Sequence, residues 1–180
     1  MRKLTLSLLM LSVVSIASAQ YRSGGGGSDK IYFGGGFGLS VGTGITSISA
    51  SPLVGYRITD EFSAGVGVTY QYLKYKEPDA QFNNFGWSLF SRYEFTDKYF
   101  SHIEYERLSF EYPTGFLTPD GDVESARGTN DAFFVGGGYR ESLSRNSSFS
   151  VTVLYDLLYD EELSPYASPL NVRAGVAVGF

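Results

Sequence analysis

The chain has 180 residues, no cysteine and a net charge of −5 at pH 7, from 14 lysines and arginines against 19 aspartates and glutamates. This balance lacks the clustered basic residues that nucleic-acid binding needs, and the absence of cysteine excludes disulfides and thiolate metal sites. Glycine, tyrosine and phenylalanine are abundant, with 22, 14 and 14 copies.

The first nineteen residues have the features of a secretion signal in the usual order. Arg2 and Lys3 supply a positive start, residues 4–16 form an apolar stretch too short to span a bilayer, and residues 17–19 (ASA) are small, as a cleavage site requires. We therefore expect a signal peptide over 1–19. No cysteine follows it, so a lipoprotein anchor is not expected.

Residues 20–29 contain four consecutive glycines. Such a run holds regular structure only at a high entropic cost, and it predicts a flexible N-terminal tether. No helical pattern follows and no Lys-Ser/Thr closes the run, so it does not match a phosphate-binding loop. We expect the remaining residues, 30–180, to form a single domain.

From residue 30 onward, apolar and polar residues alternate with a period of two. Eight such segments follow one another: 30–41, 46–58, 62–75, 83–95, 99–112, 132–143, 148–160 and 170–180. This period predicts β-strands, and each segment is close to the length of a tilted membrane strand. No continuous apolar run of about twenty residues, the length of a transmembrane helix, occurs in this region.

The connections between the segments alternate in length. The short ones are 59–61, 96–98 and 144–147, and the longer ones are 77–82, 113–130 and 161–169. The first hairpin, at 42–45, is a short exception on the long-loop side. Short turns at one end and long loops at the other are typical of outer-membrane barrels. An even strand count would place both termini at the short-turn, periplasmic end.

Alternation alone does not say which face points inward. A secreted lipocalin, with its apolar face inside, is the alternative eight-stranded barrel. Two features favour an apolar exterior. The second face carries long uncharged runs such as Gly34-Gly36-Gly38 and Ser63-Gly65-Gly67, which suit a narrow lumen, and aromatics gather at both ends of the segments, as in the two belts of a membrane barrel.

Most of the strand charges fall on that same second face. An arginine or lysine at the lipid midplane would cost about 2–4 kcal/mol, whereas acids and bases in the interior can pair. We predict a lumen polar network made of Arg92, Glu94, His102, Glu104, Glu106, Arg140, Asp156 and Arg173.

The C-terminal segment 172–180 (VRAGVAVGF) alternates and ends on an aromatic residue, Phe180. Together with residues 51–62 (SPLVGYRITDEF), it resembles the small outer-membrane β-barrel family of OmpA/OmpX type. The lipocalin Gly-x-Trp motif is missing near the first strand, and Trp87 is the only tryptophan. The resemblance implies that Phe180 is the signal read by the barrel-assembly machinery.

The resulting fold prediction is an all-β, eight-stranded antiparallel up-and-down transmembrane β-barrel in the outer membrane of a Gram-negative bacterium. Eight strands enclose an interior just wide enough for side chains to fill, so we expect a closed lumen.

Candidate chemistry is sparse. Some small outer-membrane barrels are lipid A acyltransferases or deacylases that use a histidine, a serine and an acid near the outer leaflet. His102 is the only histidine, but it follows a short turn and is expected near the periplasmic end. Ser101 faces the opposite side of the same strand. Asp120 and Asp122 lack the EF-hand spacing. We expect no catalytic residue, cofactor or metal.

The sequence thus favours a non-enzymatic membrane barrel with a structural or interaction role. The alternatives are an accessory subunit of a larger secretion or barrel-assembly complex, a narrow pore and, least favoured, a lipid-modifying enzyme. The expected partners are outer-membrane lipid and lipopolysaccharide, the barrel-assembly machinery through the C-terminal strand, and proteins that bind the tether or loop 113–130. Nucleic acid is not among them.

Overall fold

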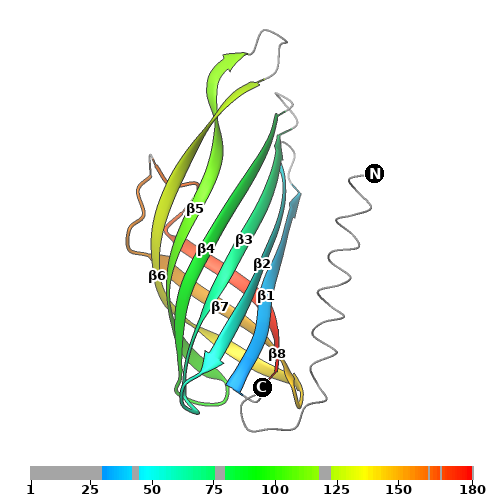
Figure 1. The fold of residues 1–180 in the computed structure, drawn as a ribbon, viewed down its shortest axis with the longest axis vertical. Helices are drawn as coiled ribbons and strands as arrows, with labels where there is room; N and C mark the ends of the chain where they lie inside the picture. The colour runs from blue at the N-terminus through cyan, green and yellow to red at the C-terminus, as the bar shows by residue number, and fades with distance from the viewer. Residues whose placement is uncertain are drawn as a thin grey trace.

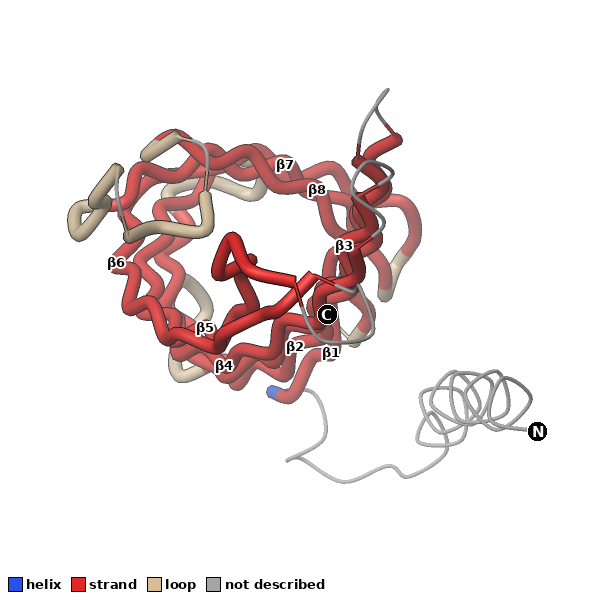
Figure 2. Tube along the Cα trace, turned by 90° about the horizontal axis from the view of Figure 1, so that it is seen from above, coloured by secondary structure: helices blue, strands red, loops and turns tan. Residues whose placement is uncertain are grey.

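The protein is described by a computed structural model that covers residues 30–41, 45–75, 80–117, 123–161, 163–166 and 168–179. The predicted signal peptide, the tether and Phe180 lie outside these residues. Eight antiparallel strands close into a barrel in chain order, each beside its sequence neighbours (Figures 1 and 2). The strands are β1 (Ile31–Val41), β2 (Ile45–Arg57), β3 (Phe62–Tyr75), β4 (Ala80–Glu94), β5 (Tyr99–Leu117), β6 (Val123–Ser144), β7 (Ser147–Asp156) and β8 (Leu170–Val178).

The predicted fold class, an all-β, eight-stranded up-and-down antiparallel barrel, is confirmed. The third strand has the predicted bounds, 62–75. The loop predicted over 77–82 is shorter, because β4 begins at Ala80. No helix among the described residues is long and apolar enough to cross a membrane.

The loop predicted over residues 113–130 is wrong, because most of it continues the β5–β6 hairpin. The two strands stay in register up to the pair Pro113↔Ser125 and pair again at Leu117↔Val123 after a register shift. In Figure 1 this hairpin rises above the rest of the barrel. The longest predicted loop is therefore a two-stranded ribbon, with a tip that lies outside the described residues.

Pro113 and Gly115 concealed this ribbon, since both residue types usually interrupt strands. The ladder between β4 and β5 ends at the pair Phe85↔Ser109, so the outer part of β5 is an edge strand. A proline, which lacks a backbone N–H, is tolerated at such an edge.

β7 ends at Asp156, four residues before the predicted end. The Oδ1 atom of Asp156 accepts hydrogen bonds from the backbone N–H groups of Phe133 and Leu158, both at 3.0 Å. The carboxylate thus accepts backbone hydrogen bonds where the chain leaves the strand, and residues 157–160 do not extend β7.

Two of the short turns use the same side-chain chemistry. The hydroxyl of Thr59 accepts from the backbone N–H groups of Glu61 and Phe62, at 3.2 and 3.0 Å. The hydroxyl of Thr96 does the same in the next short turn, at 3.3 and 3.1 Å. Threonine hydroxyls in such turns stabilise a local reversal of the backbone. The repeated Thr-Asp dipeptide therefore fixes the register of two hairpins.

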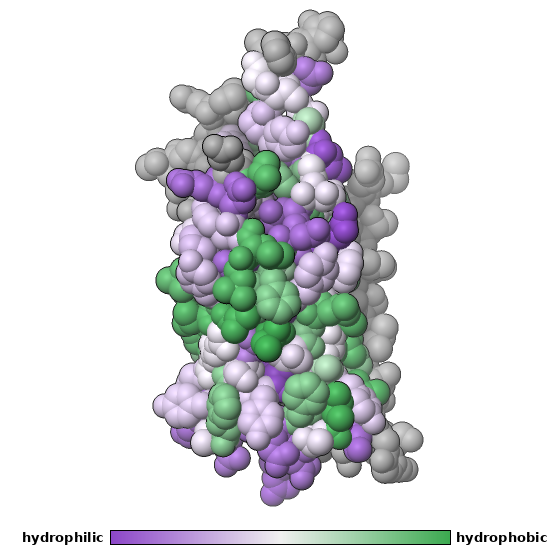
Figure 3. Space-filling model, turned by 90° about the vertical axis from the view of Figure 1, so that its left-hand side faces the viewer, coloured by the Kyte–Doolittle hydropathy of each residue, from purple (hydrophilic) through white to green (hydrophobic). Residues whose placement is uncertain are grey.

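The apolar residues of the alternating pattern point outward, as predicted. Within β4, Phe85, Trp87 and Leu89 are about half exposed. Ser88 and Phe90, which alternate with them along the strand, are buried. Figure 3 shows the resulting apolar belt across the middle of the barrel, with polar residues toward both ends. The barrel therefore buries its smaller, more polar face and exposes its apolar face.

Inside the barrel, large side chains lie over glycines on the neighbouring strand. Tyr32 covers Gly55, its partner in the β1–β2 ladder: a Cβ atom on Gly55 would lie 2.1 Å from the Tyr32 ring. Three more cross-strand pairs have the same arrangement, Phe90 with Gly65, Phe100 with Gly138 and Leu108 with Gly86. The interior is narrow, so each inward ring occupies the space that a facing side chain would need.

This packing predicts that Gly138→Ala destabilises the barrel by about 1–3 kcal/mol, as overpacking typically does. The new methyl group would lie 2.4 Å from the Phe100 ring and 2.5 Å from the Val151 carbonyl oxygen. Urea unfolding measures the change. Gly128→Ala is the matched control, because its nearest neighbours are 3.4 Å away. Equal stability of both variants would contradict the packing argument.

Candidate functional site in the barrel lumen

The eight residues of the predicted lumen polar network occupy inward-facing positions of their strands. His102, Glu104, Glu106 and Asp156 are buried, and the three arginines and Glu94 are partly buried. The structure does not join all eight into one network. It forms one ion pair at the short-turn end and one continuous chain of contacts deeper in the barrel.

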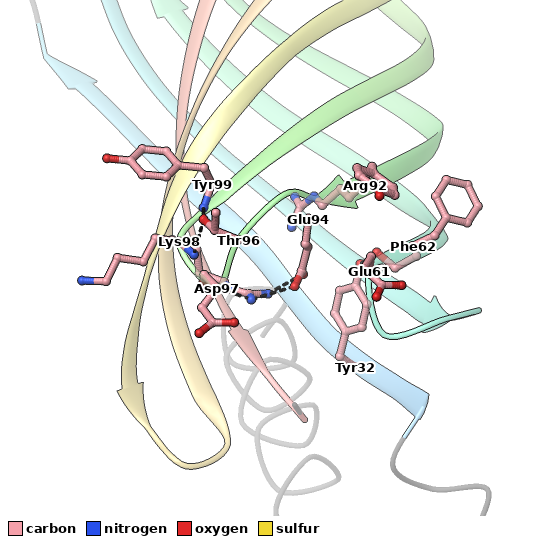
Figure 4. A network of polar contacts seen from close by, with 12 residues as sticks. Tyr32, Glu61, Phe62, Arg92, Glu94, Thr96, Asp97, Lys98 and Tyr99 are labelled. Atoms are coloured by element: carbon pink, nitrogen blue, oxygen red, sulfur yellow. Dashed lines mark hydrogen bonds and ion pairs between the residues drawn. The ribbon is translucent and has the colours of Figure 1, made fainter.

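The ion pair at the short-turn end joins Arg140 of β6 to Glu94 of β4. Both guanidinium Nη atoms donate to the carboxylate, at 2.5 and 2.8 Å. Arg140 also donates to the backbone oxygen of Asp97 in the adjacent turn, at 3.3 Å. Figure 4 shows Glu94 turned toward the interior next to Arg92, with Lys98 pointing away. A paired, bidentate geometry of this kind is among the strongest arrangements of opposite charges.

The chain of contacts begins at Arg92 and His102, which lie opposite each other on β4 and β5. Arg92 Nε donates to His102 Nδ1 at 3.0 Å, and His102 Nε2 lies 2.8 Å from a carboxylate oxygen of Glu104. An arginine nitrogen can only donate, so Nδ1 accepts and the ring proton sits on Nε2. The imidazole is thereby neutral, and both of its nitrogens are engaged.

Arg173 of β8 extends this chain across the lumen. Its Nη1 donates to both carboxylate oxygens of Glu104, at 3.1 and 3.0 Å, and its Nη2 lies 3.8 Å from Glu106. The guanidinium also lies 4.7 Å above the ring centre of Phe134. The hydroxyl of Tyr166 donates to Glu106. One arginine therefore compensates two buried carboxylates.

Asp156 is not brought to any of the arginines. Its Oδ1 caps the end of β7, and its buried Oδ2 has no hydrogen-bond partner among the described residues. The prediction that Asp156 shares a network with Arg92, Arg140 and Arg173 is therefore not reflected in a direct contact.

The interior also contains a cavity of about 610 Å³. Residues of β1, β2, β3, β4, β5, β7 and β8 line it. Much of the cavity wall consists of glycines and hydroxyl residues, among them Gly34, Gly67, Ser51, Thr69, Ser150 and Thr152. Among the described residues of the wall, the charged side chains are Arg92, Arg173, Glu104 and Glu106.

A second polar group lies on the outside of the short-turn end. The ammonium of Lys98 donates to Glu141 at 3.2 Å and to the hydroxyl of Tyr139 at 3.4 Å. The Glu141 carboxylate raises the pKa of Lys98 above its ordinary value. Both partners of the Lys98–Glu141 pair are about half exposed, so solvent screens the interaction.

Sequence reasoning missed several of these contacts. Tyr166 lies in the segment between β7 and β8. This segment has no alternating pattern, so the sequence did not predict that the Tyr166 side chain faces inward. Asn171 accepts from Arg173 Nε at 3.1 Å. His102 and Glu104, two residues apart, face the same side of β5, as the period of a strand requires.

No group of three or more metal-binding side chains occurs within the described part of the chain.

Comparison with known proteins does not assign the chain to a family. No protein-family model matches the chain, and no curated protein matches it.

The contacts of Arg173 predict that Arg173→Met destabilises the barrel by about 3 kcal/mol, the low end for removing one partner of a buried ion pair. The low end applies because 31% of the Arg173 side chain is exposed, whereas Glu104 and Glu106 are almost wholly buried and would lose their cation. Urea unfolding measures the change. The double variant Arg173→Met/Glu104→Gln should recover part of it.

The matched control is Lys98→Met, which breaks an exposed ion pair and should leave the unfolding midpoint unchanged. If Arg173→Met behaves like this control, the pairing of Arg173 with Glu104 and Glu106 contributes nothing to stability and the assignment is wrong.

Proposed function

We propose that the protein is an integral outer-membrane β-barrel with a non-enzymatic structural or interaction role. The observation that carries the proposal is the exposed apolar belt of the closed barrel (Figure 3). Val66, Val68, Leu89 and Val153 are each about half exposed. Soluble proteins rarely leave so large a continuous apolar surface in water, whereas a bilayer covers it.

The closed sheet and the interior charges support the same proposal. A membrane barrel must satisfy its backbone groups between strands, and the ladders here run from each strand to both neighbours. The strand charges Arg140, Glu94, Arg173 and Glu104 pair with one another inside the barrel. Outward aromatics such as Tyr56, near the short turns, also suit a membrane interface.

The β5–β6 ribbon is the element proposed to meet a partner. It rises above the rest of the barrel (Figure 1), and an ion pair between Arg127 and Glu111 joins its two strands. Both side chains also bond to the backbone of Asn83 in β4, which holds the base of the ribbon on the barrel. A role as a subunit of a larger outer-membrane assembly would be tested by detergent pull-down, in which recovery of the barrel alone counts against it.

The membrane proposal predicts opposite outcomes for two leucine-to-arginine variants. Leu89 lies in the apolar belt, and Leu89→Arg should cost about 2–4 kcal/mol if its side chain faces lipid. Leu163 lies outside the strands and is more exposed, at 68% against 51% for Leu89, so Leu163→Arg should be neutral. Urea unfolding in phosphatidylcholine vesicles, followed by the fluorescence of Trp87, measures both. If both variants are as stable as the parent, the belt faces water.

The lumen cavity favours a narrow pore as the second candidate function. A volume of about 610 Å³ beside the Arg173–Glu104 pair leaves room for water in the lumen. Planar-bilayer recording distinguishes the candidates: single-channel steps that grow in Arg173→Ala support a pore constricted at Arg173. A silent bilayer for both proteins supports the closed barrel.

A further inference from the structure

The seam between β1 and β8, where the barrel closes, is paired over a short stretch only. Its ladder contains four residue pairs, from Phe33↔Val178 to Gly36↔Gly175. Each of the other seven ladders contains at least nine. The same register would next bring Phe37 beside Ala174, but this pair is not formed. Figure 1 shows β1 and β8 meeting near their lower ends and separating above.

The side chains that border this gap are unusually exposed. Phe37 is 67% exposed and Val172 is 64% exposed, the two highest values among the large apolar residues of the eight strands whose exposure is described; Leu143, near the end of β6, follows at 63%. Both residues point outward, on the same face as the apolar belt. The outer edge of the gap is therefore apolar and, given the membrane location proposed above, faces lipid.

The lumen cavity reaches the same gap. Its wall includes Gly36 and Phe37 from β1 together with Val172, Arg173 and Ala174 from β8. Phe37 and Val172 thus border both the apolar exterior and the cavity. The unpaired part of the seam therefore lies against the cavity at the level of these two residues.

Glycines lie where the paired part of the seam ends. A Cβ atom on Gly36 would lie 3.0 Å from the backbone oxygen of Ala174, and one on Gly175 would lie 3.0 Å from that of Gly35. The two backbones therefore approach closely at these glycines. A sheet edge without partners is not found exposed to hydrocarbon, so the unpaired stretch above these glycines needs polar groups beside it.

We propose that this gap is a lateral binding site for a single-chain amphiphile with an uncharged, hydroxyl-bearing head group. The head group lies in the lumen cavity, and the acyl chain passes between Phe37 and Val172 into the bilayer. This inference rests on the membrane location proposed above. The hydroxyls of the head group hydrogen-bond the free strand edges and the hydroxyl residues of the wall.

The charges of the cavity determine the class of head group. Two arginines and two glutamates line it, and His102 is neutral in its hydrogen-bonding arrangement. The described part of the wall therefore carries no net charge, which does not favour an ionic head group. Ser51, Thr69 and Thr152 offer hydroxyls instead. The volume, about 610 Å³, lies within the range of small-molecule sites, roughly 300–1,000 Å³.

Photo-labelling with two monoacylglycerol probes tests the proposal in vesicles of phosphatidylcholine. One probe carries a diazirine in the head group and the other carries it in the acyl chain, and peptide mass spectrometry locates the adducts. The head-group probe should label lumen peptides of β2, β3 and β7, and the chain probe should label Phe37 and Val172 above the rest of the belt. Absence of lumen labelling by the head-group probe would overturn the proposal.

A cross-link between two introduced cysteines closes the gap and tests whether the probe enters the lumen through it. The chain has no native cysteine, so Phe37→Cys/Ala174→Cys, joined by a short thiol-bridging reagent, tests the open part of the seam. Phe33→Cys/Val178→Cys is the matched control, because these residues are already paired. The first bridge should reduce lumen labelling several-fold, and the second should not. Equal labelling in both bridged proteins would contradict the lateral route.

Two further results separate the inference from the membrane proposal. Ser51→Phe fills the cavity without a bridge, and it should lower lumen labelling while leaving belt labelling intact. Belt labelling without any lumen labelling in the parent protein would refute the lateral site alone. If the chain probe labels no part of the belt, the membrane location itself fails, and the lateral site fails with it.

Discussion

The interior width of a closed eight-stranded sheet is the constraint on which the rest of this structure depends. With so little room, several inward rings lie against a glycine of the facing strand, as Tyr32 does with Gly55. The same limit directs charges to meet across the lumen, because long side chains from different strands end near one another. Packing and electrostatics inside the barrel are therefore two consequences of one geometric restriction.

The period-two pattern was sufficient to predict the number of strands and the inward face of charged residues such as Arg92 and Glu104. Once strand directions are set by short turns, cross-strand neighbours follow, and Arg92 beside His102 is an example. Contacts that come from outside the strands could not be predicted in this way. Tyr166 reaches Glu106 from a connecting segment, and its position depends on the path of that segment over the barrel.

Two other features were hidden for different reasons. The β5–β6 ribbon contains a proline and glycines, whose usual effect on strands outweighed the weak alternation around them. The seam between β1 and β8 depends on how the whole sheet closes, which no local stretch of sequence records. In both cases the deciding factor is which backbone edge has a neighbour, and this is a property of the complete barrel.

The order of the ladders also bears on how the barrel forms. Seven ladders join strands that are consecutive in the chain, and each is a hairpin whose contacts close short loops at modest entropic cost. The eighth joins the first strand to the last, the most distant pairing in sequence, and it is the shortest. Such a pairing contributes most to contact order. A growing sheet would thus curl hairpin by hairpin, and its last and weakest step would be the meeting of β1 with β8.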